Sequence, residues 1–190
     1  MSSATRATDA RPLACLSRRK FLYAALGVGS SLTATGVVGG LWVRGPVPSV
    51  AGLRVLSAFE FRVVSDIVSA TFPAAGPIPL DARELELPRV FDGFVADLPA
   101  EQQTDLRRAL LLVEIAPLIW DGKRTTFTRL SPEDRAAYWE NWAASDRLLQ
   151  RQISLTFRKF LNMLFYDWFE VWSHIGYPGP SLARLSGAPQ

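Results

Sequence analysis

The stretch Leu56–Pro73, LSAFEFRVVSDIVSATFP, carries the clearest signal of secondary structure in the chain. Ser57 precedes Glu60 by three residues, the spacing of a capping box, in which each side chain accepts a hydrogen bond from the backbone N–H of the other residue. Apolar residues then recur at the spacing of one helix face: Phe59, Val63, Val64, Ile67 and Val68. The stretch predicts an amphipathic helix that begins after Ser57 and ends at a loop from Pro73 to Pro79.

Residues 52–190 continue in the same helical period, and no long stretch alternates as a strand would. A second helix is expected from Leu87-Pro88 until Pro99, and a third from Ala100 to about Pro117. The next residues, GKRTTFTRL, predict a basic loop or a short extended piece. Ser131 is a good N-cap for a fourth helix, and a long fifth helix is expected over Asp146–Ile175, ended by Gly176. The sequence therefore predicts an all-α protein with a single domain of about five helices.

The fifth predicted helix is unusually rich in aromatic residues. Phe165, Trp168, Phe169 and Trp172 follow one another at helical spacing, which predicts a stripe facing the core. Tyr166 falls off that stripe, so either the whole helix is internal or part of it is covered by a partner. Tyrosine and tryptophan are favoured in interfaces. We expect a partner interface formed by Tyr166, Trp172, Tyr177, Pro178 and Pro180.

The N-terminal segment, residues 1–51, has the pattern of an export signal. It reads SRRKFL from Ser17, followed by residues 21–43, which contain no charge and five glycines. Paired arginines before a mildly apolar run are typical of a twin-arginine signal, which a receptor reads as an address. The predicted signal residues are Ser17, Arg18, Arg19, Phe21 and Leu22. A buried helix over residues 21–43 is the competing interpretation.

The sequence at the end of this segment indicates where it would be cleaved. Ser49-Val50-Ala51 offers small residues for signal cleavage after Ala51, although residues 21–43 are also long enough to remain as a membrane anchor.

Residues 1–51 hold six basic residues and one acidic residue, whereas the rest of the chain is slightly acidic. Since nucleic-acid binding needs a basic face on the folded body, we expect no nucleic-acid partner.

The sequence offers few residues for chemistry. His174 is the single histidine, near the end of a helix, where interaction with the last carbonyl groups is the usual role. Cys15 is the single cysteine and lies in the N-terminal segment. Zinc, haem and iron–sulfur sites need clustered cysteine or histidine. We therefore expect no catalytic, cofactor-binding or metal-binding residues in this chain.

Several segments, taken in order, resemble the gluconate 2-dehydrogenase subunit 3 family. They are SRRKFL at 17–22, LSAFEFRVVSDIVSATFP at 56–73, LRRALLLVEIAP at 106–117, FTRLSPEDRAAYWENWAAS at 127–145 and WSHIGYPGP at 172–180. Their order and spacing carry the resemblance, which covers most of the chain.

The resemblance implies a non-catalytic small subunit of a membrane dehydrogenase. Its partner would be a catalytic subunit of the glucose–methanol–choline type that carries FAD, often with a cytochrome c subunit. The small subunit would bring the folded partner to the twin-arginine translocase, and the complex would lie in the bacterial periplasm at the cytoplasmic membrane. Two alternatives stay open from the residues: a self-standing exported or membrane-anchored binding protein, and a periplasmic enzyme in its own right.

Overall fold

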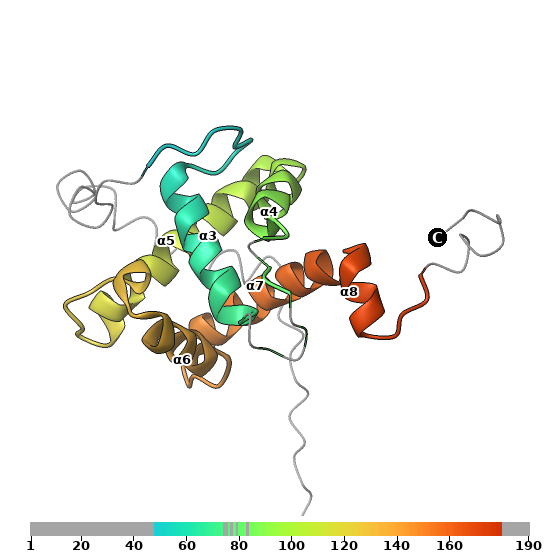
Figure 1. Cartoon of the computed structure of the whole chain (residues 1–190). Coiled ribbons are helices and arrows are strands. Elements are labelled where there is room, and N and C mark those ends of the chain that lie inside the picture. The colour runs from blue at the N-terminus through green and yellow to red at the C-terminus, as the bar shows by residue number, and fades with distance from the viewer. Residues whose placement is uncertain (1–47, 74–75, 77, 79, 83, 180–190) are drawn as a thin grey trace, which may run out of the picture.

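The computed structural model describes residues 48–73, 76, 78, 80–82 and 84–179 (Figure 1). These residues form six α-helices, one 3₁₀ turn and no strand, so the predicted all-α class is confirmed. The elements are α3 (Ala58–Thr71), α4 (Leu87–Ala96), α5 (Ala100–Trp120), η1 (Phe127–Arg129), α6 (Pro132–Ala143), α7 (Leu148–Tyr166) and α8 (Phe169–His174). The predicted signal residues Ser17, Arg18, Arg19, Phe21 and Leu22, and Pro180, lie outside the described residues.

Helix α3 is the centre of the bundle and packs against α4, α5 and α6. Its predicted capping box is confirmed: the Ser57 hydroxyl accepts from the Glu60 N–H at 3.3 Å, and the Glu60 carboxylate accepts from the Ser57 N–H at 2.7 Å. The predicted apolar face is buried, with Val63, Val64, Ile67 and Val68 almost fully shielded from solvent. Figure 1 shows α3 crossing α7, with α4 beside it.

Helix α5 runs past Pro117 to Trp120, so the predicted stop at this proline is wrong. A proline lacks the N–H that would bond to the carbonyl four residues earlier. In the last turn this costs a single intrahelical bond, while Ala116 and Pro117 are buried and Trp120 packs on the core. Packing therefore outweighs the missing bond, and the chain leaves the helix only after Trp120.

The segment expected to be a basic loop or an extended piece instead contains the 3₁₀ turn η1. Phe127 is fully buried in it and lies 6.2 Å, between ring centroids, from both Tyr138 and Trp139. The backbone N–H of Thr128 and its hydroxyl both donate to the buried Glu114 carboxylate, at 3.0 and 2.8 Å. These contacts turn an apparently polar segment into part of the core.

Helix α6 begins as predicted, with the Ser131 hydroxyl accepting from the Asp134 N–H at 3.1 Å and Pro132 in the first turn. Trp139 and Trp142 are buried on it, and the Trp139 indole N–H donates to the Thr71 hydroxyl of α3 at 2.9 Å. Beside them, the guanidinium of Arg135 reaches Asp66 of α3 at 2.5 Å. Helices α3 and α6 are therefore joined by the Trp139–Thr71 hydrogen bond and by a partly buried ion pair.

The long fifth helix predicted over 146–175 is wrong, because the chain folds it as two helices. Helix α7 ends at Tyr166, and Trp168 takes an extended backbone conformation, φ −77° and ψ 131°, before α8 begins at Phe169. The predicted end at Gly176 is correct: this glycine has φ 66°, a left-handed conformation that stops a helix at little cost. In Figure 1, α8 lies beyond the bundle at the far end of α7.

Ahead of α3, residues 54–56 are held against α4 by one carboxylate. Asp92 is buried and accepts from the backbone N–H groups of Arg54, Val55 and Leu56 at 2.6, 3.2 and 2.8 Å. The exposed Ala51 carbonyl accepts from the Arg89 side chain of α4 at 2.9 Å. The chain is thus attached to the body on both sides of the position after Ala51 where cleavage is predicted, while cleavage itself stays a prediction.

Candidate functional site

The C-terminal end of α7 and helix α8 form the candidate site, a surface in which aromatic side chains are only partly buried. The two helices meet at Asp167-Trp168, where the Trp168 N–H donates to the Phe165 carbonyl at 3.3 Å. Because this turn changes the direction of the chain, α8 does not continue the faces of α7. Its main neighbour is α7 rather than the rest of the bundle.

The site is anchored from beneath by Phe165 and Val171, both buried. The Phe165 ring stacks on Phe72 at the end of α3, with centroids 4.4 Å apart and planes 24° from parallel. Val171 is the buried residue of α8, and Trp168 is half-buried against the core. This foundation fixes the position of the aromatic residues that point outward.

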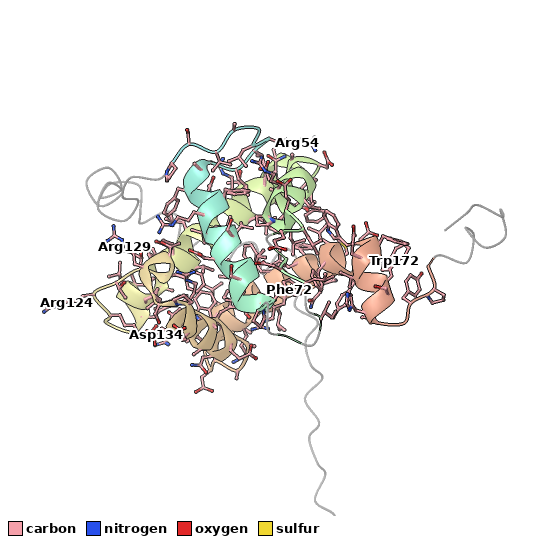
Figure 2. The ribbon with its side chains drawn as sticks, viewed as in Figure 1. Arg54, Phe72, Arg124, Arg129, Asp134 and Trp172 are labelled. Carbon is pink, nitrogen blue, oxygen red and sulfur yellow. The ribbon has the colours of Figure 1, made fainter. Side chains whose placement is uncertain are left out.

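Trp172 organises the outer part of the site (Figure 2). Its indole N–H donates to the Tyr166 carbonyl at 2.8 Å. The ring meets Phe169 at 5.8 Å and Tyr177 at 5.3 Å in edge-to-face geometry, and its backbone carbonyl accepts from the Tyr177 N–H at 3.0 Å. Edge-to-face pairs of this kind add about 0.5–1.5 kcal/mol beyond their burial. The aromatic end of the molecule therefore has a defined shape.

Two glycines permit the chain to return over Trp172. Gly176 and Gly179 have φ of 66° and 85°, which side chains other than glycine rarely adopt. A Cβ atom on Gly179 would lie 3.4 Å from Cζ3 of Trp172, so the backbone passes close to the indole. The sequence IGYPG from Ile175 thus forms a turn that keeps Tyr177 against Trp172.

Large apolar side chains remain exposed around this cluster. Phe169 is the most open, at 67%, and the others are close to half-exposed: Tyr166, Ile175 and Tyr177. Together with Trp172 they make a continuous series along residues 166–177. Isolated exposed apolar residues are ordinary on protein surfaces, whereas a cluster of aromatic side chains marks an interaction site.

Four of the five residues predicted for the interface lie in this site: Tyr166, Trp172, Tyr177 and Pro178. The prediction that Phe169 lies on a core-facing stripe is wrong, because the break at Asp167-Trp168 turns its side chain to solvent. Phe169 was missed for this reason, and Ile175, the last residue of the predicted helix, was not among the residues predicted for the interface. Asp167 is followed three residues later by Glu170, a spacing typical of the start of a helix. This spacing was the signal in the sequence that could have predicted a second helix.

The buried polar groups elsewhere in the described residues serve the fold. Arg135 also donates to the carbonyls of Thr128 and Leu130, at 3.1 and 3.0 Å, while its buried Nε and the buried Thr126 hydroxyl have no hydrogen-bond partner among the described residues. His174 is exposed in the last turn of α8. Tyr138 donates to Asp121 at 2.7 Å, and burial, together with this bond, raises the pKa of Tyr138 above its ordinary value.

Within the described ranges, no group of three or more histidine, cysteine, aspartate or glutamate side chains is arranged to hold a metal ion. None of the helices in the same part of the chain is both long and apolar enough to span a membrane.

Comparison of the chain with protein-family models, with curated proteins and with solved structures gives no match.

Proposed function

We propose that the chain is a non-catalytic small subunit of a flavin-dependent sugar or alcohol dehydrogenase complex. It would escort the folded catalytic subunit through twin-arginine export and stabilise it afterwards. The FAD would sit in the catalytic subunit, of the glucose–methanol–choline type, and a cytochrome c subunit would receive the electrons. The complex would work in the bacterial periplasm, at the cytoplasmic membrane.

The observation that carries this proposal is the aromatic surface over Tyr166–Tyr177. A subunit that stabilises a larger protein needs a shaped apolar surface to hold it, and aromatic side chains with one polar end are suited to that role. Further support comes from the sequence: the paired arginines at Arg18 and Arg19, and the ordered resemblance to the gluconate 2-dehydrogenase subunit 3 family. Because the twin-arginine route carries folded proteins, a flavoprotein without its own signal would travel with this chain.

The same surface would also serve a self-standing exported or membrane-anchored helical binding protein. Purification of the tagged chain from its native host separates the two functions. Co-purification of a protein that contains FAD supports the dehydrogenase subunit, whereas a monomer without any flavoprotein favours the self-standing protein.

The escort role is tested by the double change Arg18→Lys with Arg19→Lys in the native host. The charge is kept, but the arginine pair that the export receptor reads is lost. We expect the dehydrogenase activity of the partner to disappear from the periplasm and to remain in the cytoplasm. The matched control is Arg6→Lys with Arg11→Lys, which changes two arginines outside the motif and should leave export intact. Unchanged periplasmic activity in the first variant would show that the chain is not the escort.

A further inference from the structure

The peptide bond between Ala51 and Gly52, where cleavage is predicted, lies in a turn that is attached to α4. Gly52 has φ 78°, in the left-handed region that residues other than glycine rarely adopt. The Ala51 carbonyl accepts from the Arg89 guanidinium at 2.9 Å. A Cβ atom on Gly52 would lie 3.5 Å from Nη1 of the same arginine, so the backbone passes close to it. The bond is therefore not part of an extended chain.

The residues that follow this bond are held by a second residue of α4. The buried Asp92 accepts from the backbone N–H groups of residues 54–56, at 2.6, 3.2 and 2.8 Å. Figure 2 shows Arg54 beside α4, where its guanidinium donates to the Asp97 carboxylate at 2.9 Å. We call Arg89 and Asp92 the clamp, because together they hold the chain on both sides of Gly52.

The clamp leaves little free chain next to the bond. Only Gly52 and Leu53 separate the Ala51 carbonyl from the first N–H group that Asp92 holds, and two residues span at most about 7 Å when fully extended. A peptidase binds the chain around the bond that it cuts in an extended conformation, much as a peptide adds to the edge of a sheet. It also directs its own hydrogen-bond donors at the carbonyl oxygen on which negative charge develops. In the folded chain the Ala51 oxygen is already bonded to Arg89, so this segment must leave α4 before it can be cut.

Exposure of the small side chains does not by itself open the bond. Ser49 and Ala51, which occupy the −3 and −1 positions of the predicted cleavage site, are both exposed. A peptidase could therefore recognise these residues in an opened chain. What the fold withholds is the extended backbone, and this depends on the clamp rather than on the sequence of the cleavage site.

We propose that the folded body keeps the Ala51–Gly52 bond closed to signal peptidase, so that the exported chain keeps residues 1–51. This inference rests on the export route of the proposed function, because a chain that folds before export presents the bond to the peptidase with the clamp already formed. Cleavage would add one water molecule across the bond, with the hydroxyl group on the Ala51 carbonyl carbon and the hydrogen on the Gly52 nitrogen. Residues 21–43, which are long enough to remain as a membrane anchor, would stay joined to the body.

The test measures how fast purified signal peptidase cuts the purified full chain, followed by intact mass. A synthetic peptide of residues 44–57 lacks α4 and should be cut after Ala51, whereas the folded wild type should be cut at least about tenfold more slowly. Arg89→Met frees the Ala51 carbonyl, and Asp92→Ala releases residues 54–56. The double variant loses four hydrogen bonds that hold the segment, so we expect it to be cut about tenfold or more faster than the wild type.

Two controls separate opening of the clamp from unfolding of the whole body. Phe127→Leu weakens the buried core at η1 and leaves the clamp intact, so it should be cut as slowly as the wild type. Ala51→Phe, added to the double variant, places a large residue at the −1 position and should abolish the cut. If the double variant does not fold, Arg89→Met alone takes its place. The Arg89 side chain is 41% exposed, and we expect this single change to speed the cut about threefold.

Several results would overturn the inference. They are a wild type cut as fast as the peptide, a peptide that the peptidase does not cut, and a rate raised equally in Phe127→Leu and in the double variant. The last would show that global unfolding exposes the bond, and an uncut peptide would show that the sequence rather than the fold is the barrier.

The mass of the chain in the native host completes the test. The exported wild type should keep the residues before Ala51, whereas the exported double variant should begin at Gly52. A wild type that begins at Gly52, or at any residue of 18–51, would show that the segment is removed and would overturn the inference. Failure of the proposed function is seen separately, as a chain with which no flavoprotein co-purifies, while the rates and masses still decide whether the clamp protects the bond.

Discussion

Removal of the Asp92 side chain tests how the chain ahead of α3 is attached to the body. Asp92 is only 2% exposed, and its two carboxylate oxygens accept from three consecutive backbone N–H groups, those of Arg54, Val55 and Leu56. Hydrogen bonds to a charged acceptor contribute about 1.5–3 kcal/mol each. The bonds to Arg54 and Val55 are only partly buried, so after Asp92→Ala those donors can turn to water, and we expect a total loss of about 2–4 kcal/mol.

The matched control for Asp92 is Asp97. Asp92 accepts from the backbone N–H of Arg54, whereas Asp97 accepts from the side chain of the same arginine. Asp97 accepts from the Arg54 guanidinium at 2.9 Å, but both side chains are largely exposed. Exposed ion pairs contribute about 0–1 kcal/mol, so Asp97→Ala should change stability little. Asp92→Asn keeps one carbonyl oxygen but turns an N–H₂ group toward a backbone donor. Its loss of unfolding free energy should therefore lie between the losses of Asp92→Ala and Asp97→Ala.

Urea unfolding of the three variants, followed by tryptophan fluorescence, measures the free energy of unfolding. Hydrogen exchange then reports on the amides of residues 54–56, which should lose protection in Asp92→Ala and keep it in Asp97→Ala. A loss below about 1 kcal/mol for Asp92→Ala, or a loss equal to that of Asp97→Ala, would refute the idea that burial makes these three bonds valuable.

Two further predictions concern Tyr138 and the C-terminal turn. Since the pKa of Tyr138 is raised by burial and by its bond to Asp121, the folded state holds the phenol proton more tightly than the unfolded state, whose pKa is about 10. The stability that this difference in pKa gives to the folded state is complete below about pH 10 and is lost as the pH rises toward the folded pKa of Tyr138. Tyr138→Phe should therefore be about 1 kcal/mol less stable at neutral pH, with the difference shrinking at alkaline pH in urea titrations, and a constant difference would contradict it. Truncation after Ile175 removes Tyr177 and its contacts to Trp172, outside the bundle, so it should weaken flavoprotein binding more than it lowers the melting temperature; equal effects would count against an interface there.

Local signals sufficed where a helix end depends on neighbouring residues. The Ser57 and Glu60 capping box, the Ser131 cap and the left-handed Gly176 act over one turn, so sequence spacing alone predicts them. The buried face of α3 followed from periodicity for the same reason. At Pro117 and η1, in contrast, the outcome depends on which distant side chains are packed nearby, and the sequence-based prediction was wrong.

The candidate site was only partly predictable. Aromatic richness drew attention to Tyr166, Trp172, Tyr177 and Pro178, but a continuous helix placed Phe169 in the core. The turn at Asp167-Trp168 reverses that assignment, since residues on either side of it no longer share one helical period. Phe165 stays buried by stacking on Phe72, ninety-three positions away in the chain, a contact that no local pattern contains.

The sequence by itself determined the helical class and the starts of α3 and α6, because each depends on residues within one or two turns. The tertiary structure decided which apolar residues are covered. It split the last helix, buried Phe127 of an apparently polar segment, bonded that segment to the buried Glu114 of α5, and left Phe169 exposed. The physical reason is that periodicity shows a residue's direction around its helix axis, whereas burial depends on which other elements lie in that direction.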